Sequence, residues 1–206
     1  MFWFANAFMA MSNMESDFDD NMTVTAHTNT YVPDRMANSY VSDLSNEVAA
    51  GLGYSTGGVN VGAVTRTKTT ANSWSVQRAA STAYALGDVV RPAAANGFIY
   101  RATTAGTTAA GLPTYPTVLG QTVVDGGVTW ECYGVGIVVW TWTTPPSWSS
   151  ATFVFRHLVL SDRTPGTAAT QPLIAISTYG SDQTASGTTF TINAHASLGI
   201  LHVAIQ

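Results

Sequence analysis

Short strand patterns broken by turn residues, from Gln77 to Gly134, constrain the fold of this chain most strongly. Asn96-Gly97 stands before the apolar run 98–100 and predicts a two-residue hairpin turn. Asp125-Gly126-Gly127 predicts another turn before the run 128–132. Residues 102–122 are rich in Gly, Thr, Ala and Pro and predict a long ordered loop. About three strands and this loop make a β-module of under ~60 residues, a size that needs support from the rest of the chain.

The segments on either side of this module each resemble half of another β-domain. Before it, 22–28 and 59–65 show strand alternation. After it, strand patterns separated by turn residues occupy 138–143, 151–160, 172–177, 188–193 and 199–205. This spacing favours a mainly β fold, either a β-sandwich or a barrel. We therefore expect a discontinuous β-rich domain (1–76 and 135–206) with an inserted all-β module (77–134).

The N-terminal segment predicts a short helix. Phe4, Phe8 and Met11 recur at intervals of three to four residues, which is the spacing of one helical face. No Lys or Arg precedes this apolar run, and it is shorter than the ~20 residues of a membrane-spanning helix. We expect neither a secretion signal nor a membrane span, but an amphipathic helix or a segment that anchors the chain against a neighbouring subunit.

The low charge content limits the classes of partner. Charged residues make up 10% of the chain, whereas a typical soluble domain has roughly 25%. The net charge is −4, and the 8 Lys and Arg residues form no basic cluster, so nucleic-acid binding is not expected. The polar surface must come from Thr, Ser, Asn and backbone groups. Such a surface is common in a subunit of a large assembly or in a protein held outside the cell.

No pattern in the sequence predicts a metal centre. The histidines lack metal-ligand spacing with a neighbouring carboxylate and stand in or beside predicted strands, at His27, His157, His195 and His202. Asp17, Asp19 and Asn21 alternate like the start of a calcium loop, but Met22 replaces its turn glycine and Thr28 its bidentate glutamate. The favoured interpretation is a solvated turn, and we expect no metal and no cofactor.

Catalysis is not predicted either. No Gly-x-Ser-x-Gly motif supplies a nucleophilic serine. The acids weighed for glycoside hydrolysis are Asp88, Asp125, Glu131, Asp162 and Asp182. Asp88 and Asp125 stand in turns, where aspartate ordinarily bonds to the backbone. Cys132, the single cysteine, lies in a predicted strand and is expected to be a small buried apolar residue. We expect a protein that is not an enzyme.

The aromatic residues of the module allow two interpretations. Aromatic faces stack on sugar rings, so an exposed set could bind carbohydrate, and its candidate residues are Tyr84, Tyr100, Tyr115 and Trp130. A module this small also needs aromatic side chains for its own core, because each buries a large area. The core interpretation is favoured for Tyr100 and Trp130, whereas Tyr115, in a proline-flanked loop, is balanced between the two.

The pattern of the module is similar to a known family. Tyr84-x-x-Gly87-Asp88-Val-Val90, then Asn96 to Ala102, Pro113-x-Tyr115-Pro116 and Asp125 to Glu131 follow one another after Trp74. This arrangement resembles the small carbohydrate-binding-like modules of tailed-bacteriophage virion proteins, which are distantly similar to chitin-binding modules. The resemblance covers about a quarter of the chain and implies an all-β module.

The flanks resemble a phage structural-protein family. The matching segments are Phe18 to Thr28, Tyr31-x-Pro33-Asp34, Asn46-Glu47-Val48, Gly53-Tyr54-x-x-Gly57-Gly58-Val59, Thr152 to Val159 and Pro172 to Ala175. This resemblance implies a structural virion protein with no catalytic residues. We expect a capsid decoration or cement protein at the particle surface, with a tail- or fibre-associated glycan-binding adhesin as the alternative. The implied partners are the major capsid protein or other virion subunits, further copies of the chain (a trimer among the arrangements) and, for the adhesin, a host-surface glycan, but neither nucleic acid nor membrane.

Overall fold

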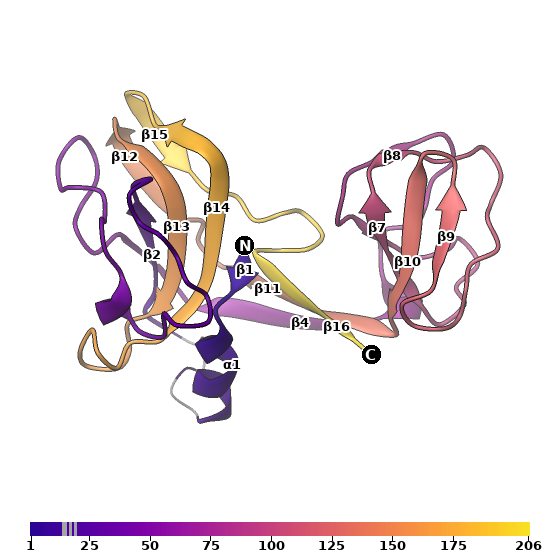
Figure 1. Cartoon of the computed structure of the whole chain (residues 1–206), viewed down its shortest axis with the longest axis horizontal. Helices are drawn as coiled ribbons and strands as arrows, with labels where there is room; N and C mark the ends of the chain where they lie inside the picture. The colour runs from indigo at the N-terminus through magenta and orange to yellow at the C-terminus, as the bar shows by residue number, and fades with distance from the viewer. Residues whose placement is uncertain (14–15, 17, 19) are drawn as a thin grey trace. The chain divides into compact units, whose positions relative to one another are not determined.

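The computed structural model in Figure 1 describes residues 1–13, 16, 18 and 20–206. The chain is mainly β, with one short N-terminal helix and several antiparallel sheets in a sandwich-like fold, so the predicted fold class is confirmed. Its contacts form two compact units. The body is Met1–Thr65 with Trp140–Leu201, and the insert unit is Arg66–Val139 with His202–Gln206. The predicted module 77–134 lies within the insert unit, and Asp17 and Asp19 of the rejected calcium loop lie outside the described residues.

The body is built on a five-stranded antiparallel sheet. Its order is β1 (Phe2–Trp3), β14 (Leu173–Thr184), β13 (Val154–Asp162), β2 (Met22–His27) and β3 (Val59–Gly62). A separate pair joins β12 (Ser147–Ala151) to β15 (Thr188–Thr191). All six residues of β2 are buried, although its sequence alternates, because the strand lies inside the sheet with both faces covered.

A third sheet has the order β16 (Leu201–Ile205), β11 (Gly136–Trp142) and β4 (Val64–Thr70). The boundaries between the two units fall inside these three strands. Each of these three strands therefore has residues in both units. Short 3₁₀ turns occupy Val41–Asp43 and Ala71–Ser73.

The insert unit contains a four-stranded sheet in the order β6 (Val89–Val90), β7 (Ile99–Thr104), β10 (Val128–Gly134) and β9 (Thr122–Asp125), and a pair of β5 (Ala83–Tyr84) with β8 (Gly106–Thr107). The two-residue hairpin predicted at Asn96-Gly97 is wrong, because residues 91–98 all separate β6 from β7. Asn96 instead stabilises this longer loop by accepting a hydrogen bond from the Phe98 amide and donating one to the Tyr100 hydroxyl. The true two-residue hairpin is Gly126-Gly127, across which Asp125 pairs with Val128.

The predicted N-terminal helix is present, but Phe4, Phe8 and Met11 do not share one environment, because Phe4 is buried ahead of the helix and Phe8 is exposed. Helix α1 spans Ala5–Ser12 and buries Ala7 and Ala10, whereas Phe8 is 47% exposed. The cause lies just upstream, where Phe2–Trp3 pair with β14 as β1 and the Phe4 amide donates to Ile174 O at 3.0 Å. This pairing buries Phe4 before the helix starts and fixes which side of α1 meets the sheet.

Gly58 shows a position where only glycine fits. It has φ +77°, and a Cβ built on it would lie 2.1 Å from the backbone oxygen of Val24 in β2. The neighbouring Gly57 also has a positive φ, +93°, but a Cβ there would meet nothing within 4 Å. An alanine at residue 57 would therefore meet only the energetic cost of a left-handed backbone. An alanine at residue 58 would meet that cost and also a steric clash with β2.

We predict that Gly58→Ala destabilises the body more than Gly57→Ala does. The left-handed conformation should cost each variant about 1–2 kcal/mol. Overpacking against β2 should add about 1–3 kcal/mol for Gly58→Ala alone. Denaturant unfolding of the two variants and the parent chain checks this, and equal losses of unfolding free energy would contradict the close packing of residue 58 on β2.

Candidate functional site

The aromatic residues proposed for sugar binding form the core of the insert unit. Tyr100 and Trp130 are both 0% exposed and pack with Val90, Ala102, Val128 and Cys132. They lie on β7 and β10, where Trp130 is the cross-strand partner of Ala102. Since neither ring has a face open to a ligand, Tyr100 and Trp130 are corrected from sugar-binding candidates to core residues.

Tyr84 and Tyr115 lie at the edge of the same cluster and are half-buried. The Tyr84 ring meets Trp130 edge-on at 5.1 Å, and its hydroxyl accepts a hydrogen bond from the Ala79 amide at 2.8 Å. The Tyr115 ring lies 4.5 Å from that of Tyr100, and burial raises the pKa of the Tyr115 hydroxyl. The structure thus brings all four candidate residues together as one packed group rather than as an open aromatic platform.

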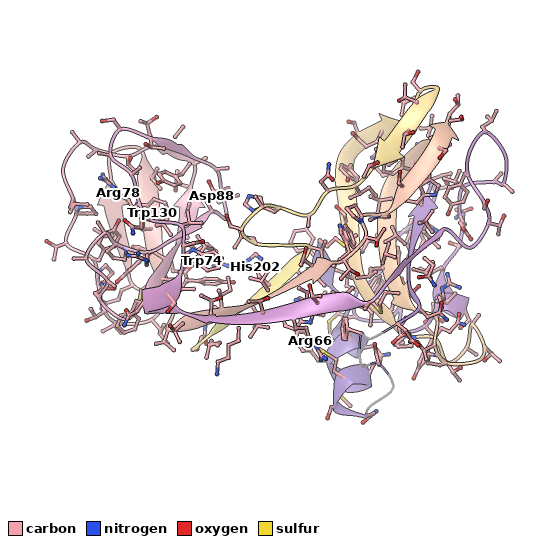
Figure 2. All side chains as sticks on the ribbon, turned by 180° about the vertical axis from the view of Figure 1, so that it is seen from behind. Arg66, Trp74, Arg78, Asp88, Trp130 and His202 are labelled. Atoms are coloured by element: carbon pink, nitrogen blue, oxygen red, sulfur yellow. The ribbon has the colours of Figure 1, made fainter. Side chains whose placement is uncertain are left out.

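A buried ion pair ties the long loop of the insert unit to its sheet. The Arg78 Nε donates to Asp125 Oδ2 at 2.9 Å and the Arg78 Nη2 to Asp125 Oδ1 at 2.7 Å, and both side chains are almost completely buried. Asp125 also accepts hydrogen bonds from the Trp130 indole at 2.9 Å and the Ala109 amide at 3.0 Å. Arg78 donates further to the backbone oxygens of Ala109 and Gly111. Figure 2 marks Arg78 and Trp130 within this unit.

This network assigns Asp125 a structural role. Desolvation alone would raise the pKa of its carboxyl, but hydrogen bonds from Arg78, Trp130 and the Ala109 amide outweigh it and lower the pKa. The carboxylate is therefore ionised and fully engaged with donors of its own unit. Asp88, the other turn acid weighed for catalysis, accepts a hydrogen bond from the Ala85 amide at 2.8 Å, as expected of a turn aspartate.

Two buried histidines form a ring cluster that the sequence did not predict. His27 on β2 and His157 on β13 are directly opposite cross-strand partners, and the Tyr31 ring lies 5.0 Å from the first and 5.6 Å from the second. His27 bonds through Nδ1 to Ser45 O and through Nε2 to Thr25 Oγ1, and His157 bonds to Thr178 Oγ1. Only the strand register reveals this pairing, since the two residues lie far apart in sequence.

The cluster packs through its rings and is hydrogen-bonded to hydroxyl and backbone groups. Across the described residues, no group of three or more His, Cys, Asp or Glu side chains is placed to hold a metal ion. Burial lowers the pKa of both His27 and His157, and for His157 the charges of His27 and Arg156 act in the same direction. Cys132 is buried as expected, and desolvation raises the pKa of its thiol.

The glycine-rich segment after residue 46 is held to the body sheet by one carboxylate. Glu47 Oε1 accepts hydrogen bonds from the Tyr54 hydroxyl and the Gly57 amide, both at 2.7 Å, and that hydroxyl accepts one from the Ala26 amide of β2 at 3.0 Å. Burial and the hydrogen bond to Glu47 raise the pKa of Tyr54. The Glu47, Tyr54 and Gly57-Gly58 motif therefore positions a loop.

The tip of that loop carries an exposed leucine with a left-handed backbone conformation. Leu52 is 71% exposed and has φ +52°, and the following Gly53 has φ +85°. Gly51 and Tyr54 exchange backbone hydrogen bonds at 2.9 Å, so Leu52-Gly53 form a two-residue turn with two positive φ angles. Such turns strongly prefer Asn-Gly, because leucine is strained in this conformation. The sequence Gly51-Leu52-Gly53 was the available signal, but it indicated only a loop.

We predict that Asp125→Asn destabilises the insert unit by about 3–5 kcal/mol, because it leaves the Arg78 charge buried without its partner. The matched control is Glu131→Gln, which removes a carboxylate paired with Arg101 at 2.6 Å on the same sheet, where both side chains are partly exposed. The control should cost at most about 1 kcal/mol. Denaturant unfolding followed by Trp fluorescence measures both, and similar losses would contradict a dominant Arg78–Asp125 pair.

We also predict that the stability of the body falls as the pH drops below about 6.5. The folded-state pKa of His27 and His157 is lower than the ordinary 6.5, so the unfolded chain binds more protons in this window. Each histidine then contributes a slope of up to about 1.4 kcal/mol per pH unit. His157→Gln should reduce the slope, because it removes one of the two histidines. Unfolding free energies measured from pH 7 to about pH 5 check this, and an unchanged slope in His157→Gln would contradict it.

A scan of protein-family models, a search of curated proteins and a search of solved structures each found no match to this chain. No helix in the described part of the chain is long and apolar enough to cross a membrane. The chain's own residues are therefore the guide to its function: the body holds an exposed, strained leucine, and the aromatic residues of the insert unit form its core.

Proposed function

We propose that this chain is a structural subunit of a tailed-bacteriophage virion, and that it decorates or cements the head surface. The support from the sequence is the resemblance of the flanks and of the module to phage structural proteins, together with a charged content of 10%. A surface with so few charges is suited to being covered by neighbouring protein subunits. Within this proposal the body docks on the particle, and docking does not require the insert unit.

The observation that carries the proposal is the exposed leucine at the tip of the body loop. Leu52 destabilises the isolated chain in two ways, because its apolar side chain is 71% exposed to water and its backbone is strained at φ +52°. The loop below it is fixed by the Glu47 network, and its own backbone is anchored where the Thr152 amide donates to Leu52 O at 2.7 Å. A rigid turn that presents a strained leucine to solvent is explained by a partner protein that buries this side chain.

Docking of this kind would stabilise the particle without any chemical step. A decoration protein that buries surface across two neighbouring capsid subunits binds the assembled lattice and not the separated subunits, so it shifts the equilibrium toward the assembled state by mass action. A stable contact of this type buries on the order of 1,200–2,000 Å² in total. One exposed turn can supply only the centre of such a contact, as a small number of apolar anchors dominate most interfaces.

The proposal is tested by adding the purified full-length chain to particles that lack it. We expect binding at fixed, symmetry-related positions on the head lattice, visible by electron cryomicroscopy, and a higher temperature of head disruption after binding. Binding confined to the tail would contradict a head-surface role and favour the adhesin alternative. Failure to bind either structure would overturn the virion proposal.

We predict opposite effects of Leu52→Asn on stability and on docking. Asparagine adopts the left-handed conformation readily and restores the preferred Asn-Gly turn, so the unfolding free energy should rise by about 0.5–1 kcal/mol. Particle affinity should fall by about tenfold or more, because the apolar anchor is lost. The matched control is Val124→Thr on the insert unit, where Val124 is 69% exposed on β9. It should leave the affinity for the particle unchanged. Equal affinities of the parent chain, Leu52→Asn and Val124→Thr would show that Leu52 does not contribute to the interface.

A further inference from the structure

A groove in the body separates the N-terminal segment from the loop that follows Tyr31. Its volume is about 500 Å³. Trp3, Phe4, Ala5 and Phe8 line one side, and residues 32–36 line the other. Trp3 supports its side of the groove through rings of the body, since its indole lies 5.1 Å from the Phe8 ring and 5.0 Å from the Trp140 ring. The groove therefore lies beside the exposed side of α1.

Hydrogen bonds fix both sides of this groove. The Ala5 amide at the start of α1 donates to Arg35 O at 2.9 Å, which joins the helix to the loop. Asp34 Oδ1 accepts hydrogen bonds from the amides of Met36 and Ala37 at 2.9 and 3.0 Å. The Asn38 side chain accepts one from the Asp34 amide at 2.9 Å. Because the loop is hydrogen-bonded internally, the groove is present before any partner binds.

Large apolar side chains are exposed around this fixed groove. The exposed fractions are 62% for Phe2, 47% for Phe8, 58% for Met9, 83% for Val32 and 82% for Met36. Helix α1 itself contains no charged residue. An exposed apolar surface built from several neighbouring side chains is characteristic of a protein–protein contact.

The same surface carries exposed apolar side chains, a hollow and both signs of charge. Phe8 and Met9 are exposed on α1, and we call them the α1 ridge; Phe8 lines the groove opposite Val32, and this groove is the hollow. Asp34 and Arg35 are consecutive at the groove, and the Arg35 guanidinium lies 5.2 Å from the centre of the Phe2 ring. A two-fold contact requires one surface to complement itself, with each residue meeting its counterpart's neighbour. Here a ridge can enter the hollow of the opposite copy, while Arg35 of each copy faces Asp34 of the other.

We propose that this groove binds the α1 ridge of a second copy of the chain, so that the protein forms a two-fold symmetric dimer in solution. The paired contact buries the apolar side chains of both copies and places no like charges against each other, because the uncharged α1 helices meet at its centre. The inference goes beyond the proposed function, since a second copy covers this groove whether or not the chain docks on a particle. Leu52, the proposed docking residue, does not line the groove.

The test is the mass of the purified full-length chain, measured by sedimentation equilibrium over a wide range of concentration. We expect a monomer–dimer equilibrium that Met36→Lys weakens by about tenfold or more, since a lysine ammonium would enter an apolar contact. Met36 is 82% exposed and bonds to Asp34 only through its backbone amide, so the variant should fold normally. Phe8→Ser, on the ridge, should weaken the dimer similarly.

The matched control is Leu86→Lys, which introduces the same charge at a residue that is 70% exposed in the insert unit and should leave the dimer intact. A chain that stays monomeric at every concentration would overturn the inference. So would a dimer that Met36→Lys does not weaken, or a trimer in place of the dimer. Head binding by a strictly monomeric chain would leave the proposed function standing, and a dimer that binds no particle would leave the groove assignment standing, so the two failures are distinguishable.

Discussion

The insert unit depends on one buried carboxylate. Asp125 receives two hydrogen bonds from Arg78, one from Trp130 and one from the Ala109 amide, and so joins the start of the unit, its long loop and its central strand. A core made of a few aromatic rings is too small to order the long loop 108–121, between β8 and β9, by apolar burial alone. The ion pair supplies that order at the expense of desolvating two charges, which is why removal of one partner is costly although the pair itself adds little net stability.

The body holds its loops through hydrogen bonds among backbone groups, hydroxyls, a histidine and a carboxylate. Its central strands are buried on both faces, so polar side chains on them must find partners inside the protein. His27 bonds to Ser45 O and Thr25, and the Tyr54 hydroxyl links the Ala26 amide to Glu47. These contacts hold the 41–58 loops against β2. They fix the turn at Leu52, while the groove beside α1 is fixed by the Ala5–Arg35 backbone bond and the hydrogen bonds of Asp34, and both places present apolar side chains to solvent.

The sequence predicts the fold class and most strands because alternation and turn residues are local properties. It fails where a long-range contact decides the outcome. The exposure of Phe8 follows from the pairing of Phe2–Trp3 with β14, and the loop at 91–98 follows from the bonds of Asn96 to Tyr100. For Tyr100 and Trp130 the sequence favours the core interpretation, because a module this small needs aromatic side chains for its own core, and both residues are buried where β7 pairs with β10. The strained turn at Leu52 and the pairing of His27 with His157 could not be predicted from the sequence. They depend on a backbone φ angle and on strand register, which local residue patterns do not determine.

The proposed position on the head surface can be tested by locating the chain on phage particles. A tag fused to the C-terminus of the full-length chain and labelled with gold can be imaged on native particles. A head-surface position predicts label at regularly spaced positions over the head, with an occupancy that repeats from particle to particle. Label restricted to the tail or its fibres, or absent from purified particles that contain every other structural protein, would contradict it.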